Sequence, residues 1–229
     1  MNAPLDFERA RFNMIEQQIR PWDVLDADVL ELLSLVRRED FVPMAHKALA
    51  FTDMQIPLLH PTDEAMQLGH CMLEPKVEAR MLQDLRVQPH EKVLEVGAGS
   101  GYMAALLAYR GQRVVTLELH PELVRIAREN LQRGGVTNVE VRETDGARGL
   151  PGEAPFDVIA LSGSVAEVPP VLLSQLKIGG RLAAIVGFQP VMRATFITRT
   201  GETTYTTAQP WDTLAPRLAN FAEPSRFHF

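Results

Sequence analysis

The chain has 229 residues, of which 46% are hydrophobic and 23% are charged, so it is long enough to bury one sizeable core. No apolar run approaches the roughly 20 residues of a membrane span, the single cysteine excludes an internal disulfide, and the six histidines form no zinc-type pattern. The net charge of −6 arises in residues 1–77, which carry 7 basic and 13 acidic side chains, and this balance argues against nucleic acid as a partner.

The cysteine content and the first residues also bear on location. Residues 1–8 lack the basic region and apolar stretch of a signal peptide. A single cysteine suits a reducing compartment. We therefore expect a cytoplasmic protein without a membrane segment or a bound metal, and no pattern predicts its oligomeric state.

The first third of the chain is expected to form a helical cap. Apolar residues recur at helical spacing between Asp6 and Gln18, Asp26 can cap a second helix, and Met44–Leu49 predicts a short third one. We assign residues 1–77 to this cap and an active-site loop. Residues 78–229 form a second part that contains the sheet, and the two parts together form one compact unit.

A long segment without clear periodicity, Thr52–Pro75, follows the cap. A loop of this length in a compact domain is usually functional or disordered. We favour a functional loop because it leads directly into the helix expected over Val77–Leu85. His60 and His70 within it are read as loop or surface residues rather than as bases.

A glycine-rich turn between a strand and a helix organises the rest of the chain. The apolar run Val93–Val96 predicts a buried strand, and Gly97, Gly99 and Gly101 then precede a helix expected over Tyr102–Arg110. Such glycines permit a tight turn and leave room for a ligand against the backbone. The spacing G-x-G-x-G differs from that of most dinucleotide sites, and glycine turns also close ordinary strand–helix connections.

An acidic residue at the end of the next expected strand favours a ligand. The strand Arg113–Leu117 runs into Glu118, about 20 residues after the glycine turn, where an acid suits ribose hydroxyls. An acid there can also cap a strand end without a ligand. Together with the glycine turn, Glu118 indicates an adenosine-containing ligand.

The later segments alternate between helix and strand patterns. Further helices are expected over Pro121–Arg133 and from Pro169 to Leu176, and further strands over Val139–Val141, Phe156–Leu161 and, after a turn at Gly179-Gly180, Arg181–Val186. This alternation predicts an α/β fold with a doubly wound, mostly parallel sheet.

The C-terminal part of the chain carries a hairpin pattern. Arg193–Thr200 and Thr203–Thr207 flank Gly201-Glu202, which predicts an antiparallel hairpin at the end of the sheet. The proline- and aromatic-rich tail, Trp211–Phe229, receives no assignment.

Several of these segments resemble a known family. Glu95–Gly101, Glu118, Asp145-Gly146 and Phe156–Ile159 resemble the class I methyltransferases that use S-adenosylmethionine. More specific segments resemble the protein-L-isoaspartate O-methyltransferase family, namely Arg38–Pro43, Ala50–Asp53, Ile56–Leu58, Val165–Pro169 and Leu176–Leu182. The resemblance covers roughly residues 8–190.

The resemblance implies a Rossmann-like fold that binds S-adenosylmethionine and releases S-adenosylhomocysteine. It implies that the acid after the third strand, Asp145, accepts a hydrogen bond from the adenine amino group, although Asp-Gly is also a common turn pair. The cofactor-binding residues that it implies are Glu95, Gly97, Ala98, Gly99, Gly101, Glu118, Leu119, Asp145 and Gly146.

One motif departs from the family pattern. The family carries G-Q-T-I-S-x-P before the glycine strand, and its hydroxyl residues lie beside the transferred methyl group. Here Gly69–Pro75 reads G-H-C-M-L-E-P, so that Cys71 and Leu73 stand at the hydroxyl positions. Leucine cannot donate a hydrogen bond, and a lone cysteine is more often a small buried hydrophobe than a catalytic thiol. We therefore assign no catalytic residue and expect isoaspartyl activity to be weak or absent.

Three functions remain open on the sequence. The first is an O-methyltransferase that acts on a carboxylate of damaged protein, which needs neither a metal nor a general base because a carboxylate is ionised at neutral pH. The second is a methyltransferase of the same fold with a small-molecule substrate. The third is a non-catalytic protein that binds S-adenosylmethionine and regulates a partner.

Overall fold

Seven strands form one sheet in the order β5-β4-β3-β6-β7-β8-β9 in the computed structural model, which describes residues 6–224. Neighbouring strands are parallel from β5 to β7 and antiparallel from β7 to β9. The predicted mixed sheet with an antiparallel hairpin is confirmed. The strands are β3 (Lys92–Val96), β4 (Arg113–Glu118), β5 (Val139–Glu143), β6 (Phe156–Val165), β7 (Leu176–Phe188), β8 (Val191–Arg199) and β9 (Tyr205–Thr213).

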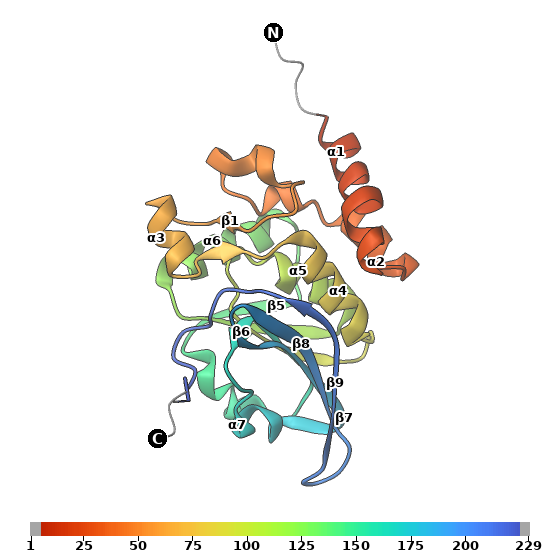
Figure 1. The fold of residues 1–229 in the computed structure, drawn as a ribbon, viewed down its shortest axis with the longest axis vertical. Helices are drawn as coiled ribbons and strands as arrows, with labels where there is room; N and C mark the ends of the chain where they lie inside the picture. The colour runs from red at the N-terminus through yellow and green to blue at the C-terminus, as the bar shows by residue number, and fades with distance from the viewer. Residues whose placement is uncertain (1–5, 225–229) are drawn as a thin grey trace.

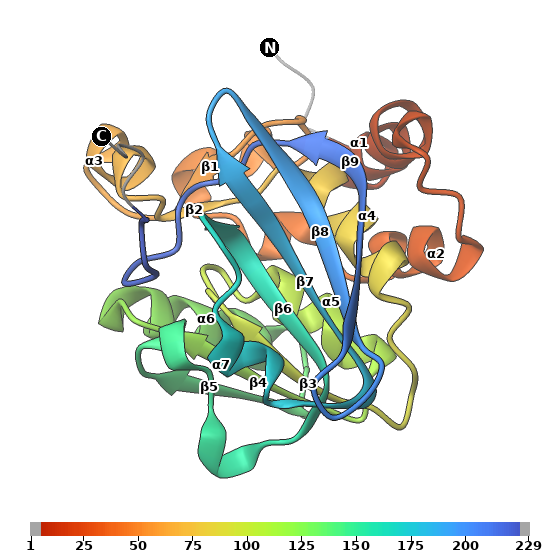
Figure 2. The same ribbon diagram turned by 60° about the horizontal axis from the view of Figure 1, so that its bottom comes forward.

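Helices cover both faces of the parallel part of the sheet (Figure 2). One core cluster joins Val93 and Val158 to apolar side chains of α4, α5 and α6, whereas Leu94 and Ile159 pack with Leu172 of α7 in a second cluster. Successive strand residues point to opposite faces, so runs that are apolar throughout require cover on both sides. The helices are α4 (Pro75–Leu85), α5 (Tyr102–Arg110), α6 (Pro121–Arg133) and α7 (Pro170–Leu173).

The N-terminal helices pack outside this layer, at the red end of the chain in Figure 1. Helix α1 (Phe7–Met14) continues through a π-helical turn at Ile15–Ile19, and α2 (Ala27–Leu35) begins after Asp26. The Asp26 carboxylate accepts from the backbone N–H of Asp28 at 2.9 Å, which confirms its predicted capping role. The outer ends of the expected cap and tail, residues 1–5 and 225–229, lie outside the described residues.

The division into two parts stays a prediction. The expected boundary after residue 77 falls inside α4. One core cluster includes both Val29 of α2 and Met103 of α5, so the cap and the sheet-containing part share buried contacts.

The segment Thr52–Pro75 is more regular than expected. It contains a small antiparallel pair, β1 (Ile56–Pro57) with β2 (Cys71–Met72), and helix α3 (Thr62–Gln67) between them. The prediction of a segment without regular structure was wrong here. Strands of two residues are too short to produce a recognisable alternation, and their stability comes from pairing with each other rather than from local pattern.

The expected turn at Gly179-Gly180 lies inside a strand. Helix α7 ends at Leu173, and β7 begins at Leu176 and continues through both glycines. The register against β6 shifts there, and a Cβ on Gly180 would lie 2.9 Å from the carbonyl oxygen of Asp157. The glycines therefore permit an irregular strand to approach its neighbour closely, which the sequence alone presents as a turn.

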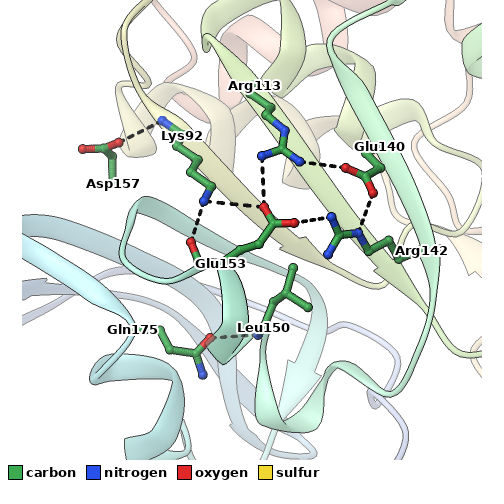
Figure 3. Close-up of polar contacts among 8 residues, drawn as sticks. All are labelled: Lys92, Arg113, Glu140, Arg142, Leu150, Glu153, Asp157 and Gln175. Atoms are coloured by element: carbon green, nitrogen blue, oxygen red, sulfur yellow. Dashed lines mark hydrogen bonds and ion pairs between the residues drawn. The ribbon is translucent and has the colours of Figure 1, made fainter.

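A cluster of ion pairs joins the first residues of β3 and β4 to side chains of β5 (Figure 3). Glu153 contacts Lys92 of β3, Arg113 of β4 and Arg142 of β5, and Glu140 pairs with both arginines. This cluster lies on the side of the sheet away from Glu118, and we assign it a structural role in the fold.

Among residues 6–224, no helix is both long enough and apolar enough to cross a membrane.

Candidate functional site

A cavity of about 210 Å³ opens where the parallel strands end. The chain leaves β3 toward β4 and β5 on one side, and β6 pairs with β3 on the other, so the cavity lies where the strand order reverses. Ligands of open α/β sheets bind at this kind of position. It is lined by the ends of several strands with the loops that follow them, by residues 68–71, and by the tail between residues 217 and 221.

Glu118 is fixed on the wall of this cavity by backbone donors. Its Oε2 accepts from the N–H of Gly99 at 2.9 Å, and its Oε1 accepts from the N–H groups of Leu119 and His120 at 2.9 and 3.0 Å. A carboxylate has about four acceptor positions, so one remains for a ligand hydroxyl. The carboxylate is thus positioned before any ligand arrives.

The glycine-rich loop contributes space rather than donors. The N–H groups of Gly97 and Ala98 are both directed at the carbonyl of Leu117, at 2.8 and 3.3 Å. Gly99 has φ +52°, and a Cβ there would meet only Leu58 Cδ1 at 3.4 Å and Cys71 O at 4.0 Å. A ligand can therefore lie against bare backbone at this turn.

Six of the nine sequence-predicted cofactor residues line the cavity, and three do not. Gly101 packs against α6, since its Cβ would lie 3.2 Å from the carbonyl oxygen of Ala127. Ala98 is buried within the loop. The third, Glu95, lies in the interior, where its carboxyl accepts a 2.6 Å hydrogen bond from Ser162 and burial raises its pKa to about 8. The six that line the cavity are Gly97, Gly99, Glu118, Leu119, Asp145 and Gly146.

Asp145 already has a partner from the C-terminal tail. Its side chain caps a short 3₁₀ turn by accepting from Ala147 N–H at 2.9 Å, and it also accepts from the side-chain amide of Asn220 at 3.0 Å. The next residue must be small, because a Cβ on Gly146 would lie 2.3 Å from Val96 Cγ1. The Asn220 amide is the same kind of donor as an adenine amino group.

The tail forms the opposite wall together with residues 68–71. Ser164 at the end of β6 donates its N–H to the carbonyl of Pro216 at 2.7 Å, and its carbonyl accepts from Leu218 N–H at 2.9 Å. A Cβ on Gly69 would lie 2.9 Å from Pro216 Cβ. Two segments far apart in the sequence therefore meet at the mouth of the cavity, and the blue end of the chain in Figure 1 shows the path of the tail.

The two residues at the altered motif positions behave differently. Cys71 lines the cavity, and its Sγ lies 3.7 Å from Gln55 Oε1. Burial, aided by the nearby Glu74 and Glu78, raises the pKa of the Cys71 thiol to about 12, so it is protonated at neutral pH. Leu73 packs into the main core, and only its carbonyl is engaged, by Arg38 Nη2 at 2.6 Å.

Several lining residues were not predicted from the sequence. His70 is a loop residue, as expected, and in addition it lines the cavity beside His120, with ring centroids 4.7 Å apart. Desolvation, followed by the neighbouring His120, lowers the pKa of His70. Ser162 directly follows the expected strand Phe156–Leu161 and lies within β6, which continues to Val165. The tail residues carried no local signal because their position depends on pairing with β6.

Comparison with known proteins gives a consistent result. The sequence model of the family described as "Protein-L-isoaspartate(D-aspartate) O-methyltransferase (PCMT)" matches residues 9–210. A protein-L-isoaspartate O-methyltransferase of Koribacter versatilis is 38% identical over 193 residues, which cover 84% of this chain and 83% of that protein. One of Myxococcus xanthus is 43% identical over 164 residues, covering 72% and 74%.

Solved structures agree on the fold. A protein-L-isoaspartate O-methyltransferase superposes with a TM-score of 0.74 at 23% identity, covering 93% of this chain and 66%, slightly under two thirds, of the other. A putative protein-L-isoaspartate O-methyltransferase from Plasmodium falciparum, in complex with S-adenosyl-L-homocysteine, gives the same TM-score at 18% identity and covers 94% and 99%.

Proposed function

This chain belongs to the protein-L-isoaspartate(D-aspartate) O-methyltransferase family, and from that premise we propose that it methylates a carboxylate of isoaspartyl residues in proteins. The methyl donor is S-adenosylmethionine, and S-adenosylhomocysteine is the product. The observation that carries this proposal is the Glu118 carboxylate, which three backbone N–H groups hold at the cavity beside the glycine-rich turn. We also propose a cytoplasmic location, which the single cysteine supports.

The residues at the cavity suit an adenosyl ligand. Glu118 retains acceptor capacity for ribose hydroxyls, and Asp145 can exchange the Asn220 amide for an adenine amino group. Gly99 provides bare backbone at the cavity, and Gly97 lines it with Leu218 of the tail packed closely against it. Leu119 and Gly146 line the cavity beside them, and we assign supporting roles to the three residues behind the lining, which are Glu95, Ala98 and Gly101.

The chemistry asks little of the protein beyond alignment. S-adenosylmethionine supplies a methyl group on a positively charged sulfur. A carboxylate acceptor is already ionised at neutral pH, so no general base is required. The protein's contribution is to hold the acceptor in line and to exclude water. Cys71 does not compete as a nucleophile, because its thiol is protonated at neutral pH.

The test uses two peptides that differ only in one residue, isoaspartyl in the first and aspartyl in the second. With labelled S-adenosylmethionine, we expect a base-labile methyl ester on the isoaspartyl peptide and none on the aspartyl peptide. Glu118→Ala should reduce transfer at limiting cofactor. Cofactor binding without any ester on the isoaspartyl peptide contradicts the proposed acceptor.

A small molecule is the second candidate acceptor, and one observation favours it. Neither motif position presents a hydroxyl, since Leu73 is packed in the core and Cys71 offers only a weak donor. A hydrogen bond to a charged carboxylate contributes about 1.5–3 kcal/mol. Its loss from the transition state slows transfer roughly ten- to more than a hundredfold.

The double variant Cys71→Thr with Leu73→Ser distinguishes these acceptors. A rise in isoaspartyl turnover indicates that the family site is retained but weakened. No rise, with S-adenosylhomocysteine affinity unchanged, favours a small-molecule acceptor or a non-catalytic regulatory protein. Robust turnover by the unmodified protein contradicts the expectation of weak isoaspartyl activity and shows that another group holds the substrate.

A further inference from the structure

We propose that Arg217 binds the methyl-accepting carboxylate and thereby determines the enzyme's preference for anionic acceptors. This inference rests on the proposed function, because it names the group that receives the acceptor at the same site. It concerns a residue of the C-terminal tail, outside the glycine-rich loop and outside the altered motif.

Arg217 stands where two spaces meet. A wider groove of about 1160 Å³ lies beside the cavity, and both spaces are lined by Leu68 and Gly69 on one wall and by Arg217 and Leu218 on the other. Because the cavity at the strand ends is assigned to the cofactor, an acceptor has to approach through a neighbouring space. The shared boundary is therefore the place where the acceptor carboxylate has to be held.

Charge singles out Arg217 at this boundary. Among the described residues that line either space, the acidic ones are Glu118, Asp145 and Glu223. The lining residue that stays cationic at any physiological pH is Arg217. The groove carries Glu223 and the cofactor cavity beside it carries the other two, so an anionic acceptor at the boundary needs a fixed positive charge to be bound rather than repelled.

The guanidinium is held in place by several contacts. Its Nη2 donates to the carbonyl of Gly187 at 3.0 Å, and its Nη1 lies 3.4 Å from Ser164 Oγ. It also lies over the ring of Phe188, 5.2 Å from the ring centroid. The backbone on either side is paired with Ser164, so both the chain and the side chain are fixed. A fixed guanidinium recognises a carboxylate with little loss of entropy.

The remaining contact of the Arg217 guanidinium is with a carboxylate, the same group that the acceptor carries. Arg217 Nε pairs with the carboxylate of Glu223 at 2.6 Å, and the Glu223 side chain is 50% exposed. Because Glu223 is solvent-exposed while Arg217 is partly buried, Glu223 is the partner that another carboxylate can replace at little cost in stability. We infer that Glu223 occupies the place of the acceptor carboxylate and is displaced when the acceptor binds.

The reaction itself favours release of the methylated product from Arg217. During transfer, a carboxylate oxygen forms a bond to the methyl carbon, the carbon–sulfur bond breaks, and its electron pair remains on sulfur. The acceptor thereby changes from an anion to a neutral ester. Arg217 then loses its anionic partner, and the Glu223 carboxylate can return.

The experiment measures binding of an isoaspartyl peptide to the protein saturated with S-adenosylhomocysteine, by fluorescence anisotropy. It compares the peptide with one in which the accepting carboxylate is replaced by a carboxamide. The wild type should bind the carboxylate peptide at least tenfold more tightly than the carboxamide. Arg217→Gln should remove this preference, Arg217→Lys should retain part of it, and Glu223→Gln should increase affinity several-fold.

Arg193→Gln is the matched control, because Arg193 also pairs with an exposed carboxylate, that of Asp212, but lines neither space. It should leave the preference unchanged. S-adenosylhomocysteine affinity, measured in parallel, should change less than twofold in Arg217→Gln and thus exclude a collapsed site.

The possible outcomes separate this inference from the proposed function. If the wild type methylates the peptide but Arg217→Gln keeps the full preference for the carboxylate, the role of Arg217 is wrong and the function stands. If the preference is present and depends on Arg217 but no methyl ester forms, the role of Arg217 stands and the function is wrong. A wild type that binds neither peptide contradicts a carboxylate site at this position.

Discussion

The two walls of the cavity are constructed in different ways. One wall comes from consecutive units of sequence. In it, β3, the glycine-rich turn, α5 and β4 place the Gly99 N–H 2.9 Å from Glu118 Oε2. The other wall brings residues 68–71 together with residues 216–221, two segments that are far apart in the sequence. Local pattern therefore predicts the first wall, whereas the second exists only because Ser164 pairs with the tail.

The two walls correspond to the two substrates. The wall formed by local units, here called the donor wall, carries the features expected for the methyl donor, S-adenosylmethionine. The wall formed by distant segments, here called the acceptor wall, carries Cys71 of the altered motif and Arg217, the features that select an acceptor. If this division is correct, substitutions on one wall should change the binding of one substrate and leave the other unaffected.

The largest effect, on the free energy of unfolding, is expected from the buried ion pair that packs beneath the altered motif. Arg38 is fully buried, pairs with the buried Glu78 and donates to the carbonyl of Leu73. Arg38→Ala leaves a buried carboxylate and a carbonyl unpaired and should lower the free energy of unfolding by about 3–5 kcal/mol. Urea denaturation measures this. Arg113→Ala, in the exposed cluster of Figure 3, should cost less than about 1 kcal/mol.

The next largest effect concerns the donor wall. Glu118→Ala removes the charged acceptor for ribose hydroxyls and should weaken S-adenosylhomocysteine binding by about 1.5–3 kcal/mol in calorimetry. Peptide binding to the cofactor-saturated protein should change little. Gly99→Val tests the same wall less directly, because Gly99 has φ +52° and a valine there strains the backbone. An equal loss of peptide affinity is incompatible with separate walls.

The free energy of unfolding should depend on pH through Glu95, which is buried beneath the donor wall. Burial raises the pKa of Glu95 to about 8, above its ordinary value of 4.5, so between these values the folded protein binds more protons than the unfolded chain. The free energy of unfolding should therefore fall as the pH rises through this range, by at most about 1.4 kcal/mol per pH unit. Glu95→Gln should reduce the slope.

Part of that slope should remain in the variant, because burial also raises the pKa of Glu78 to about 7. Denaturation of both proteins at several pH values between 5 and 8 makes the comparison. A slope that is the same in Glu95→Gln and in the wild type shows that Glu95 does not titrate in this range.

The smallest effect is expected where the two walls touch. Asn220→Ala removes the amide that occupies Asp145. If adenine uses the same carboxylate, S-adenosylhomocysteine affinity should increase by about 0.5–1.5 kcal/mol, the usual net contribution of one hydrogen bond. Gln209→Ala, which loses a hydrogen bond from its side-chain amide to Thr195 Oγ1 away from the cavity, is the control. A weaker affinity in Asn220→Ala indicates that Asn220 assists the ligand instead.

The same contrast explains what the sequence could predict. The bounds of α5 and α6 agree with the pattern at both ends, because Gly111 and Pro121 mark them locally. The pair β1 and β2 was missed because it spans two residues on each strand. Asn220 and Arg217 had no detectable role, since their place depends on a bridge to β6 that no local pattern encodes.

The most direct test of this account is a crystal structure of the protein with S-adenosylhomocysteine bound. The account predicts ribose hydroxyls within hydrogen-bond distance of Glu118 and the adenine amino group on Asp145, with the Asn220 amide displaced. A ligand that leaves the Glu118 carboxylate without a contact, or that lies in the groove beside Arg217, would contradict the assignment of the two walls.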